Sequence, residues 1–564
     1  GRDARWLAQA TASHRTNERT TDTAHHRRGS WSMRMMVPSG LDLVEGTSSA
    51  AGASGSDALT ESRARSVAGP GKQLLLTFVN RIRLDFAITW AAHVRELGLS
   101  NWLVGATDQR TLRGLRRAGV PCFGMKTALP EGEWAWGSQT FKSLGQHKIE
   151  LIYQSLSWGL ELVITDVDAL VLRDPFPYVA RWPDAGFLST SDHLSNTTSD
   201  GGLEEPSALF SAVNIGYMFF RPLAMPLVSR WRDRMRGDPR GRWDQGEFST
   251  LVQRGRGQHG GRARTSETAS DPRLFRCFGG AVLGGILPAA LFPGGHHYFV
   301  SQLPQRMGWQ PYSIHTTFQY GGAPGKRHRL REAGVWIDPP EYYDPPGPGV
   351  LAFEPELPPS LVRPEGGMDT HAHTALMTHQ LRLIRGALAL ASTLGRRLVL
   401  PPLTCGYDKY WAPLSAQGVI PGAPAWVVPI GRCPLDHLLN PAELKPSAEE
   451  WVREWSFLDN PRTPAALRDS ARTVRVDPRG GAAEVARLRA VPERVLRISN
   501  LAAISSADDS WSRAHGGGGG LLTPGEWATF ESRFASLQGG WCCAPARDKQ
   551  RGMPNNVGFH ILRV

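Results

Sequence analysis

Cysteine is scarce in this sequence, and its spacing argues against the common zinc modules. Six cysteines occur in 564 residues, and no two of them form a Cys-x-x-Cys pair. Structural zinc sites usually combine such pairs, and the adjacent Cys542 and Cys543 are a poor substitute, so we expect no structural zinc. Cys405 and Cys433 bracket a stretch rich in Pro and Gly. A disulfide in an oxidising compartment and two buried free thiols fit this pair equally well.

Long apolar runs and clustered charge are also missing. Residues 1–70 contain no apolar run of signal-anchor length. Because the first residue is Gly rather than Met, we expect the sequence to be incomplete at its N-terminus, which leaves open a membrane anchor ahead of it. The net charge of +12 comes from arginines spread along the chain. No basic run or nucleic-acid-binding motif accompanies that charge, so we expect no nucleic-acid partner.

Length and composition predict two globular domains. Apolar residues make up 41% and charged residues 21%, which is ordinary globular usage. Residues 1–70 are polar and lack periodicity, so they are predicted to be a disordered N-terminal segment. Residues 339–364 are dense in Pro and Glu and predict an extended linker between a first domain over 71–338 and a second over 365–564. Residues 254–272, rich in Arg, Gly and Ser, predict a flexible insertion in the first domain.

Strands and helices alternate in the first domain. The apolar run over 73–79 predicts a buried parallel strand, and a helix over 84–97 follows it. A strand over 101–106, a helix over 111–118 and a strand over 120–123 come next. This alternation predicts an α/β fold with a mostly parallel sheet that binds ligands beyond the carboxyl ends of its strands. The Gly-x-Gly-x-x-Gly fingerprint is missing after the first strand, which disfavours an ordinary dinucleotide site.

Two carboxylates mark the end of a later strand. An amphipathic helix over 142–158 leads into an apolar strand over 160–165, and Asp166 and Asp168 follow directly. Side chains at i and i+2 of an extended chain face the same side, so both carboxylates could approach one cation. An isolated Asp-x-Asp is more often a solvated loop. Here the chain returns at once to apolar residues 169–172, and carboxylates between buried segments are costly unless paired or metal-bound. The pattern predicts a site for Mn²⁺ or Mg²⁺, which would neutralise a departing pyrophosphate.

The remaining sequence predicts a polar loop and a second domain. Residues 190–205 are too polar for a core and predict a surface loop, which includes the glycosylation sequon at Asn196. Farther along, a helical pattern over 381–394 precedes a strand over 397–400. We therefore predict a second, smaller α/β unit after the first.

A series of motifs, in order along the chain, resembles one enzyme family. Val163 to Asp168, followed by Asp174 to Phe176, resembles the core of nucleotide-diphospho-sugar transferases of the GT-A fold. The later motifs resemble glycosyltransferase family 77, and most of the chain is similar to its plant extensin arabinosyltransferases. These later motifs are Asn214 to Pro222, Trp243 to Phe248, His315 to Tyr343, Arg396 to Leu403 and Cys433 to His437.

The resemblance implies a fold and an activity. The fold is a Rossmann-like GT-A domain with a mostly parallel sheet, followed by the smaller α/β unit. The activity is metal-dependent transfer of a pentose, L-arabinofuranose, from a UDP-sugar to a glycan on hydroxyproline-rich cell-wall glycoprotein. The transfer would retain the configuration of the sugar, and the enzyme would act in the Golgi lumen. Two alternatives stay open. One is another family 77 activity, xylosyl or galactosyl transfer to polysaccharide, and the other is a non-catalytic scaffold that binds nucleotide sugar.

The resemblance also implies metal and donor ligands. His315 would be the third metal ligand beside Asp166 and Asp168, and the alternative for it is a core histidine. Lys326, or Arg327 beside it, would hold the diphosphate as a charge-assisted donor, although this basic stretch could equally be a solvated turn. The remaining candidates for donor binding are Thr77, Asp108 and Lys148.

Three further residues are candidates for the reaction centre. Asn214, Asp244 and Gln245 would line the donor sugar, where retaining relatives place an amide or a carboxylate near the anomeric carbon. Such a group would stabilise a developing oxocarbenium ion. Asp244 could equally cap a helix, which is a common role for aspartate.

Overall fold

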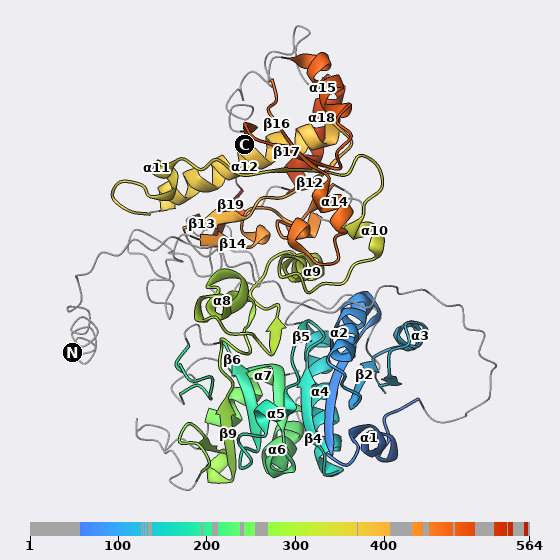
Figure 1. Ribbon diagram of the computed structural model, residues 1–564. Coiled ribbons are helices and arrows are strands. Elements are labelled where there is room, and N and C mark those ends of the chain that lie inside the picture. Colours follow the sequence, from blue (N-terminus) through green and yellow to red (C-terminus); the bar gives the residue numbers. More distant parts are fainter. Residues whose placement is uncertain are drawn as a thin grey trace, which may run out of the picture. The chain divides into compact units, whose positions relative to one another are not determined.

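The structure is a computed structural model in which two β-sheets organise the described residues (Figure 1). The residues described are 57–125, 127, 129, 132, 138–192, 196–205, 213–236, 242–253, 269–368, 370–406, 431–443, 451–477, 480–501, 524–537, 540–544 and 558–561.

The first sheet has eight strands in the order β3-β2-β1-β4-β7-β6-β9-β8. β7 runs antiparallel to β4 and β6, and β8 runs antiparallel to β9, while the other neighbours are parallel. This mostly parallel α/β sheet confirms the predicted fold class. Its strands are β1 (Gln73–Val79), β2 (Trp102–Ala106), β3 (Cys122–Gly124), β4 (Glu161–Thr165), β6 (Phe187–Ser191), β7 (Val213–Phe220), β8 (Phe275–Cys277) and β9 (Val282–Ile286).

Helices cover both faces of this sheet because its central strands are apolar on both sides. In β1, Leu75 and Val79 pack with α2 and α3, whereas Leu74 and Leu76 pack with α4 and α6. A parallel sheet with two buried faces therefore accounts for the continuous apolar run of this strand. The helices of this half are α1 (Glu61–Ala68), α2 (Leu84–Glu96), α3 (Gln109–Arg117), α4 (Gln139–Ser157), α5 (Phe176–Val179), α6 (Met225–Arg236), α7 (Asp244–Gln253), α8 (Leu303–Met307) and α9 (Gly322–Glu332), with 3-10 turns η1 (Arg81–Arg83), η3 (Pro222–Ala224) and η4 (Phe278–Gly280) and the π-turn η5 (His296–Val300).

A short antiparallel ribbon lies beyond the end of β4. It pairs β5 (Ala169–Val171) with β10 (Ser313–His315) and places His315 opposite Ala169. The ribbon thus brings a residue from the end of the first half to the carboxyl end of β4.

The second sheet has five parallel strands in the order β15-β12-β11-β17-β16. Leu351 and Phe353 of β11 pack with the long helix α12, while Val350 and Ala352 face the opposite side. The elements of this half are β11 (Val350–Phe353), β12 (Arg397–Val399), β13 (Leu403–Cys405), β14 (Gly431–Cys433), β15 (Val452–Arg453), β16 (Ala471–Val474), β17 (Val495–Ile498), β18 (Gly540–Ala544), β19 (Gly558–Ile561), α10 (Pro340–Tyr343), α11 (Pro359–Val362), α12 (Thr370–Thr393), α14 (Ala465–Asp469), α15 (Gly481–Arg489), α18 (Pro524–Leu537), η6 (Leu435–His437), η7 (Pro441–Glu443) and η8 (Phe457–Asp459).

The linker predicted over 339–364 is wrong in its centre. Val350–Phe353 forms β11, the middle strand of the second sheet, between β12 and β17. Its four residues are all buried. A four-residue strand between prolines gives too short a pattern to stand out from its Pro-rich flanks, and only pairing with distant strands makes it a core element.

The predicted disordered segment over 1–70 is also too long. Residues 1–56 lie outside the described residues, but Glu61–Ala68 forms helix α1. The Thr60 side chain accepts a hydrogen bond from the Arg63 N–H and caps this helix, and Ala64 and Ala68 are buried against the first sheet. Two alanines give too small an apolar face to be recognised in a polar sequence.

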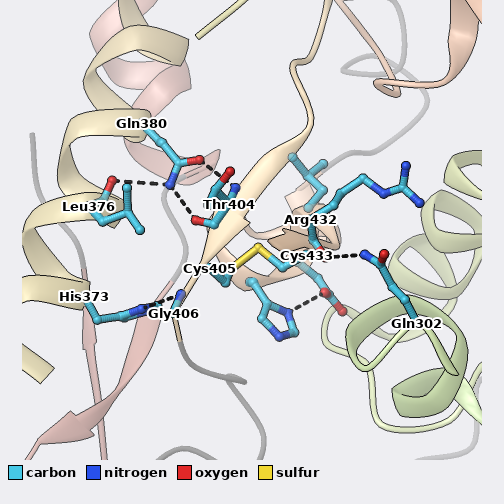
Figure 2. Close-up of a disulfide and its surroundings, with 12 residues drawn as sticks. Gln302, His373, Leu376, Gln380, Thr404, Cys405, Gly406, Arg432 and Cys433 are labelled. Atoms are coloured by element: carbon cyan, nitrogen blue, oxygen red, sulfur yellow. Dashed lines mark hydrogen bonds and ion pairs between the residues drawn. A yellow bond between two sulfur atoms is a disulfide. The ribbon is translucent and has the colours of Figure 1, made fainter. Parts of the chain in front are cut away.

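Cys405 and Cys433 form a disulfide between β13 and β14 (Figure 2). Of the two alternatives for this pair, a disulfide and two buried free thiols, the structure contains the disulfide. The predicted insertion over 254–272 lies outside the described residues except for its last four positions. Among the helices that the structure describes, none is long and apolar enough to cross a membrane.

Candidate active site at the carboxyl edge of the first sheet

Asp166 and Asp168 lie in the tight turn that joins β4 to β5. The Asp166 N–H donates to Gly216 O at 2.8 Å, and the Ala169 N–H donates to Asp166 O at 3.0 Å. The Asp168 side chain is 7% exposed and that of Asp166 38%. The turn therefore presents one carboxylate to solvent and buries the other.

His315 completes a group that can hold a cation. Its Nε2 lies 3.9 Å from Asp166 Oδ2 and 3.9 Å from Asp168 Oδ1, and one ligand atom from each residue lies within 4.8 Å of the other two. Two carboxylate oxygens and one imidazole nitrogen are a donor set that suits Mn²⁺ and other divalent ions. The predicted ligands thus come together, although a long stretch of chain separates His315 from the two aspartates.

Two lysines hold the other oxygen of each carboxylate. Lys148 Nζ lies 2.7 Å from Asp166 Oδ1 and donates to Ile215 O at 2.6 Å. Lys326 Nζ binds Asp168 Oδ2, which also accepts a hydrogen bond from Thr316 Oγ1 at 3.0 Å. In each carboxylate, one oxygen therefore faces His315, and a lysine ammonium group binds the other oxygen.

The protonation states suit metal binding. Burial lowers the pKa of His315, and the nearby lysines act in the same direction, so the imidazole is neutral at pH 7 although the two aspartates oppose this. Burial tends to raise the pKa of Asp168, but Lys326, His315 and Arg83 outweigh it and hold the pKa below its usual range. A neutral imidazole and an ionised carboxylate are the forms that bind a metal.

Gly216 makes room for the histidine ring. A Cβ atom added at this glycine would lie 2.0 Å from His315 Cε1. No side chain larger than hydrogen fits without moving the ring. The glycine of the Asn-Ile-Gly-Tyr motif is therefore explained by packing against the candidate ligand.

Asn214 and Gln245 meet at a residue that the sequence analysis did not single out. Asp192, which follows β6, accepts hydrogen bonds from Asn214 Nδ2 at 2.8 Å and from Gln245 Nε2 at 3.1 Å. Burial raises the pKa of Asp192 to about 6, although the hydrogen bonds from the two side-chain amides act to lower it. Asp192 directly follows β6 at the carboxyl edge of the sheet, but the polar stretch over 190–205 hides the end of this strand in the sequence.

Asp244 points to a different place from Gln245. It is the first residue of α7, and its carboxylate packs against α4, where a Cβ atom on Gly145 would lie 2.5 Å from Asp244 Oδ2. Burial raises its pKa to about 6, opposed by Lys148. Its Oδ1 accepts a hydrogen bond from the Gln245 N–H at 2.9 Å. Asp244 therefore supports the start of α7 near Lys148, and the catalytic role predicted for it stays a prediction.

Thr77 and Asp108 lie toward the carboxyl edge of the sheet, and their side chains form hydrogen bonds with other residues of the chain. Thr77 Oγ1 donates to Thr165 O at 3.0 Å, which joins β1 to the end of β4. Asp108 caps α3, because its carboxylate accepts hydrogen bonds from the Thr111 N–H at 2.7 Å and Thr111 Oγ1 at 2.5 Å. Their donor-binding roles stay predictions.

The basic stretch around Lys326 is not a solvated turn. It lies in helix α9, where Arg329 is 1% exposed and His328 and Arg331 are each 5% exposed. Each arginine has an acidic partner: Arg327 pairs with Asp85, Arg329 with Asp436 and Arg331 with Asp338. The sequence could not show this because the partners come from three separate segments.

Comparison with known proteins agrees with this geometry. The nucleotide-diphospho-sugar transferase family matches residues 97–330. Arabinosyltransferase XEG113 of Arabidopsis thaliana is 38% identical over 492 residues, which cover 83% of this chain and 74% of that protein. The chain belongs to the nucleotide-diphospho-sugar transferase family. This nucleotide-diphospho-sugar transferase is thus a glycosyltransferase, and the resemblance to family 77 is confirmed. Beta-arabinofuranosyltransferase RAY1 of the same plant is 26% identical over 158 residues, 28% of each chain.

Solved structures resemble the transferase only distantly. A glycosyltransferase involved in the glycosylation of the major capsid of PBCV-1 has a TM-score of 0.24 and 11% identity, over 43% of this chain and 92% of that one. The glycosyltransferase GlyE of Streptococcus pneumoniae TIGR4 has a TM-score of 0.28 and 8% identity, over 58% and 73%. With scores this low, the fold assignment rests on the sheet topology and the family.

Proposed function

We propose that this chain transfers L-arabinofuranose from a UDP-sugar to a glycan on hydroxyproline-rich cell-wall glycoprotein, with retained configuration. The observation that carries the proposal is the convergence of Asp166, Asp168 and His315 between Lys148 and Lys326. Acidic ligands with flanking cations match what a nucleotide diphosphate bound through a divalent ion requires. The choice of arabinose is supported by the similarity to an arabinosyltransferase over most of the chain.

Asp166, Asp168 and His315 would hold Mn²⁺ or Mg²⁺, which supplies charge neutralisation for the departing diphosphate. Lys326 lies at the Asp168 carboxylate and is 20% exposed, so its ammonium can donate to a diphosphate oxygen. Lys148 is 3% exposed and fixed by Ile215 O. We therefore assign Lys326 to donor binding and Lys148 to orienting Asp166.

The amide and carboxylate cluster would receive the sugar. The Gln245 amide nitrogen donates to Asp192, which leaves the Gln245 carbonyl oxygen available to a reacting carbon. Above a pH of about 6, Asp192 is an anion that can stabilise positive charge developing on the sugar ring. In the transfer, the bond from the anomeric carbon to the phosphate oxygen breaks and UDP keeps the electron pair. The acceptor hydroxyl oxygen bonds to that carbon, and its proton passes to the leaving phosphate.

The compartment is part of the same proposal. The Cys405–Cys433 disulfide supports an oxidising environment, and we propose the Golgi lumen. In that location the acceptor would be a glycoprotein of the secretory pathway.

The test is release of UDP from a panel of UDP-sugars by the purified chain, with Mn²⁺ and an arabinosylated hydroxyproline peptide. We expect UDP-arabinofuranose to turn over, and Asp168→Asn to lower kcat/KM by about 1,000-fold because the metal loses a charged ligand. Glu484→Gln is a matched control, since Glu484 is a buried carboxylate that binds Arg487 within α15 of the second half, away from the cluster. Turnover of UDP-xylose or UDP-galactose instead would overturn the choice of arabinose. Mn²⁺ and UDP binding without turnover of any sugar would support a scaffold.

A further inference from the structure

Helix α9 connects the candidate metal site to the turn η6 of the second half. It carries Lys326, which contacts Asp168, and it begins after Gly321, whose φ is 86°. No side chain caps the start of this helix. The start of this helix therefore relies on contacts from outside the helix.

Asp436 of the second half holds this helix at two points. Its Oδ2 accepts a hydrogen bond from the Tyr320 N–H at 2.9 Å, just before the helix begins. The same carboxylate binds Arg329 on the helix, with Nε to Oδ2 at 3.0 Å and Nη2 to Oδ1 at 3.1 Å. Both side chains of this pair are 1% exposed. A two-pronged contact of this kind fixes both the orientation of the helix and its position along its axis.

The Asp436 carboxylate is ionised, as the contact requires. Burial tends to raise the pKa of Asp436, but Arg329 and His437 outweigh it and hold the pKa below its usual range. The next residue back, Leu435, donates its N–H to Glu332 Oε1 at 3.0 Å, near the end of α9. The segment around Asp436 thus binds α9 before its first turn and at two residues of its last turn.

The disulfide anchors the segment that carries Asp436. Cys433 precedes Asp436 by three residues and is bonded to Cys405. Arg432 O accepts a hydrogen bond from Gln302 Nε2 at 2.6 Å, and Figure 2 shows Gln302 reaching Arg432 beside the disulfide. The segment is therefore fixed covalently to the second half and by hydrogen bonds to the first.

We propose that Asp436 is a positioning residue for donor binding. It holds α9 so that Lys326 lies at the Asp168 carboxylate, where its ammonium group can bind the diphosphate. The inference rests on the proposed function and extends it, because it makes the second half a working part of the donor site. Removing the Asp436 charge leaves Arg329 buried without its charged partner, so we expect α9 to shift. A shift of about 1 Å at a reacting group is enough to cost a large factor in activity.

Asp436→Asn in the full chain tests the proposal through UDP affinity. Calorimetry with UDP and Mn²⁺ should show about a tenfold rise in Kd, and kinetics should show a similar rise in KM for the UDP-sugar. The KM for the acceptor peptide should not change, because the acceptor does not contact α9 in this proposal. Asp436→Glu keeps the charge and should restore part of the UDP affinity.

Glu531→Gln is the matched control. It breaks the Arg385–Glu531 ion pair between α12 and α18 in the second half, and the described contacts of Glu531 do not involve α9. If a general loss of stability caused the effect, this variant would weaken UDP binding as well. Equal UDP affinity in Asp436→Asn and the unchanged protein would overturn the positioning role, even if the thermal stability of the variant falls.

Two further outcomes stay distinct. If Asp436→Asn does not fold, Arg329→Lys replaces the test, because lysine keeps the charge but loses the two-pronged contact. Its UDP Kd should rise, and an unchanged Kd would contradict the proposal. If the unchanged protein binds UDP and Mn²⁺ but turns over no sugar, the proposed function fails, while the UDP affinities of the variants still decide the role of Asp436.

Discussion

The two sheets of this chain differ in the partners that polar side chains bind at their carboxyl edges. At the first sheet, Asp166 and Asp168 follow β4, and their oxygens contact Lys148, Lys326 and His315. These partners are side chains, so a bound ion or phosphate can share or replace them.

At the second sheet, a polar side chain that follows one of the strands binds the backbone instead. Asn500, which follows β17, accepts a hydrogen bond from the Val476 N–H at 2.9 Å and donates to Val476 O at 2.8 Å. Within the part of the chain that the structure describes, the one group of three or more candidate metal ligands is Asp166, Asp168 and His315. Among the described residues, the two sheets therefore differ in whether candidate metal ligands gather at the carboxyl edge, because side chains rather than topology decide.

The largest effect that should separate the two halves is loss of the disulfide. Replacing both Cys405 and Cys433 with Ser should lower the free energy of unfolding by about 2 to 4 kcal/mol, because the loop between them is no longer closed in the unfolded chain. Mn²⁺ affinity without UDP should stay the same, since none of the three candidate ligands, Asp166, Asp168 and His315, lies in this half. Urea unfolding and Mn²⁺ titration measure the two quantities. A parallel loss of Mn²⁺ affinity would contradict the separation.

A substitution at Gly216 should have the opposite profile. Gly216→Ala forces the His315 ring aside, so Mn²⁺ affinity should fall about 10- to 100-fold, or about 1.4 to 2.7 kcal/mol. Gly71→Ala is the control, because the nearest atom to its added Cβ is 3.9 Å away. Unchanged Mn²⁺ affinity in Gly216→Ala would remove His315 from the ligand set.

The smallest effect concerns the pH dependence of stability. The folded pKa of Asp192, about 6, lies above the ordinary value of about 3.9, so the folded state binds more protons between these pH values. Stability should therefore fall as pH rises from about 4 through about 6. Asp192→Asn should lack this decline, with a difference of up to about 2 kcal/mol.

Urea unfolding of both proteins at pH 4 and pH 7 measures this difference. Other buried acids such as Asp244, whose pKa is also raised, are present in both proteins and cancel. Parallel pH profiles would show that Asp192 is not buried as described.

Local patterns explain how much of the fold could be predicted. β1, α2 and β2 were each located to within about two residues, because long apolar runs and amphipathic periods depend on neighbouring residues alone. β11 and α1 were missed, since a short strand among prolines and a helix with an alanine face carry little local signal.

The site shows the same division. Asp166 and Asp168 could be proposed from the strand that precedes them, and His315 from the family resemblance. Asp192 could not, because its role depends on amides from β7 and α7 that meet it only in the folded chain. The basic stretch at Lys326 was ambiguous for the same reason.

The sequence by itself determined the α/β class, the carboxylate pair at the end of a strand and the family of the enzyme, because these depend on residues that are close along the chain. Only the tertiary structure decided that Asp192 joins Asn214 and Gln245, that β11 is a central strand, and that Asp436 holds the helix of Lys326. The physical reason is that hydrogen bonds and ion pairs require contact, and contact between distant segments is set by how the sheets and helices pack.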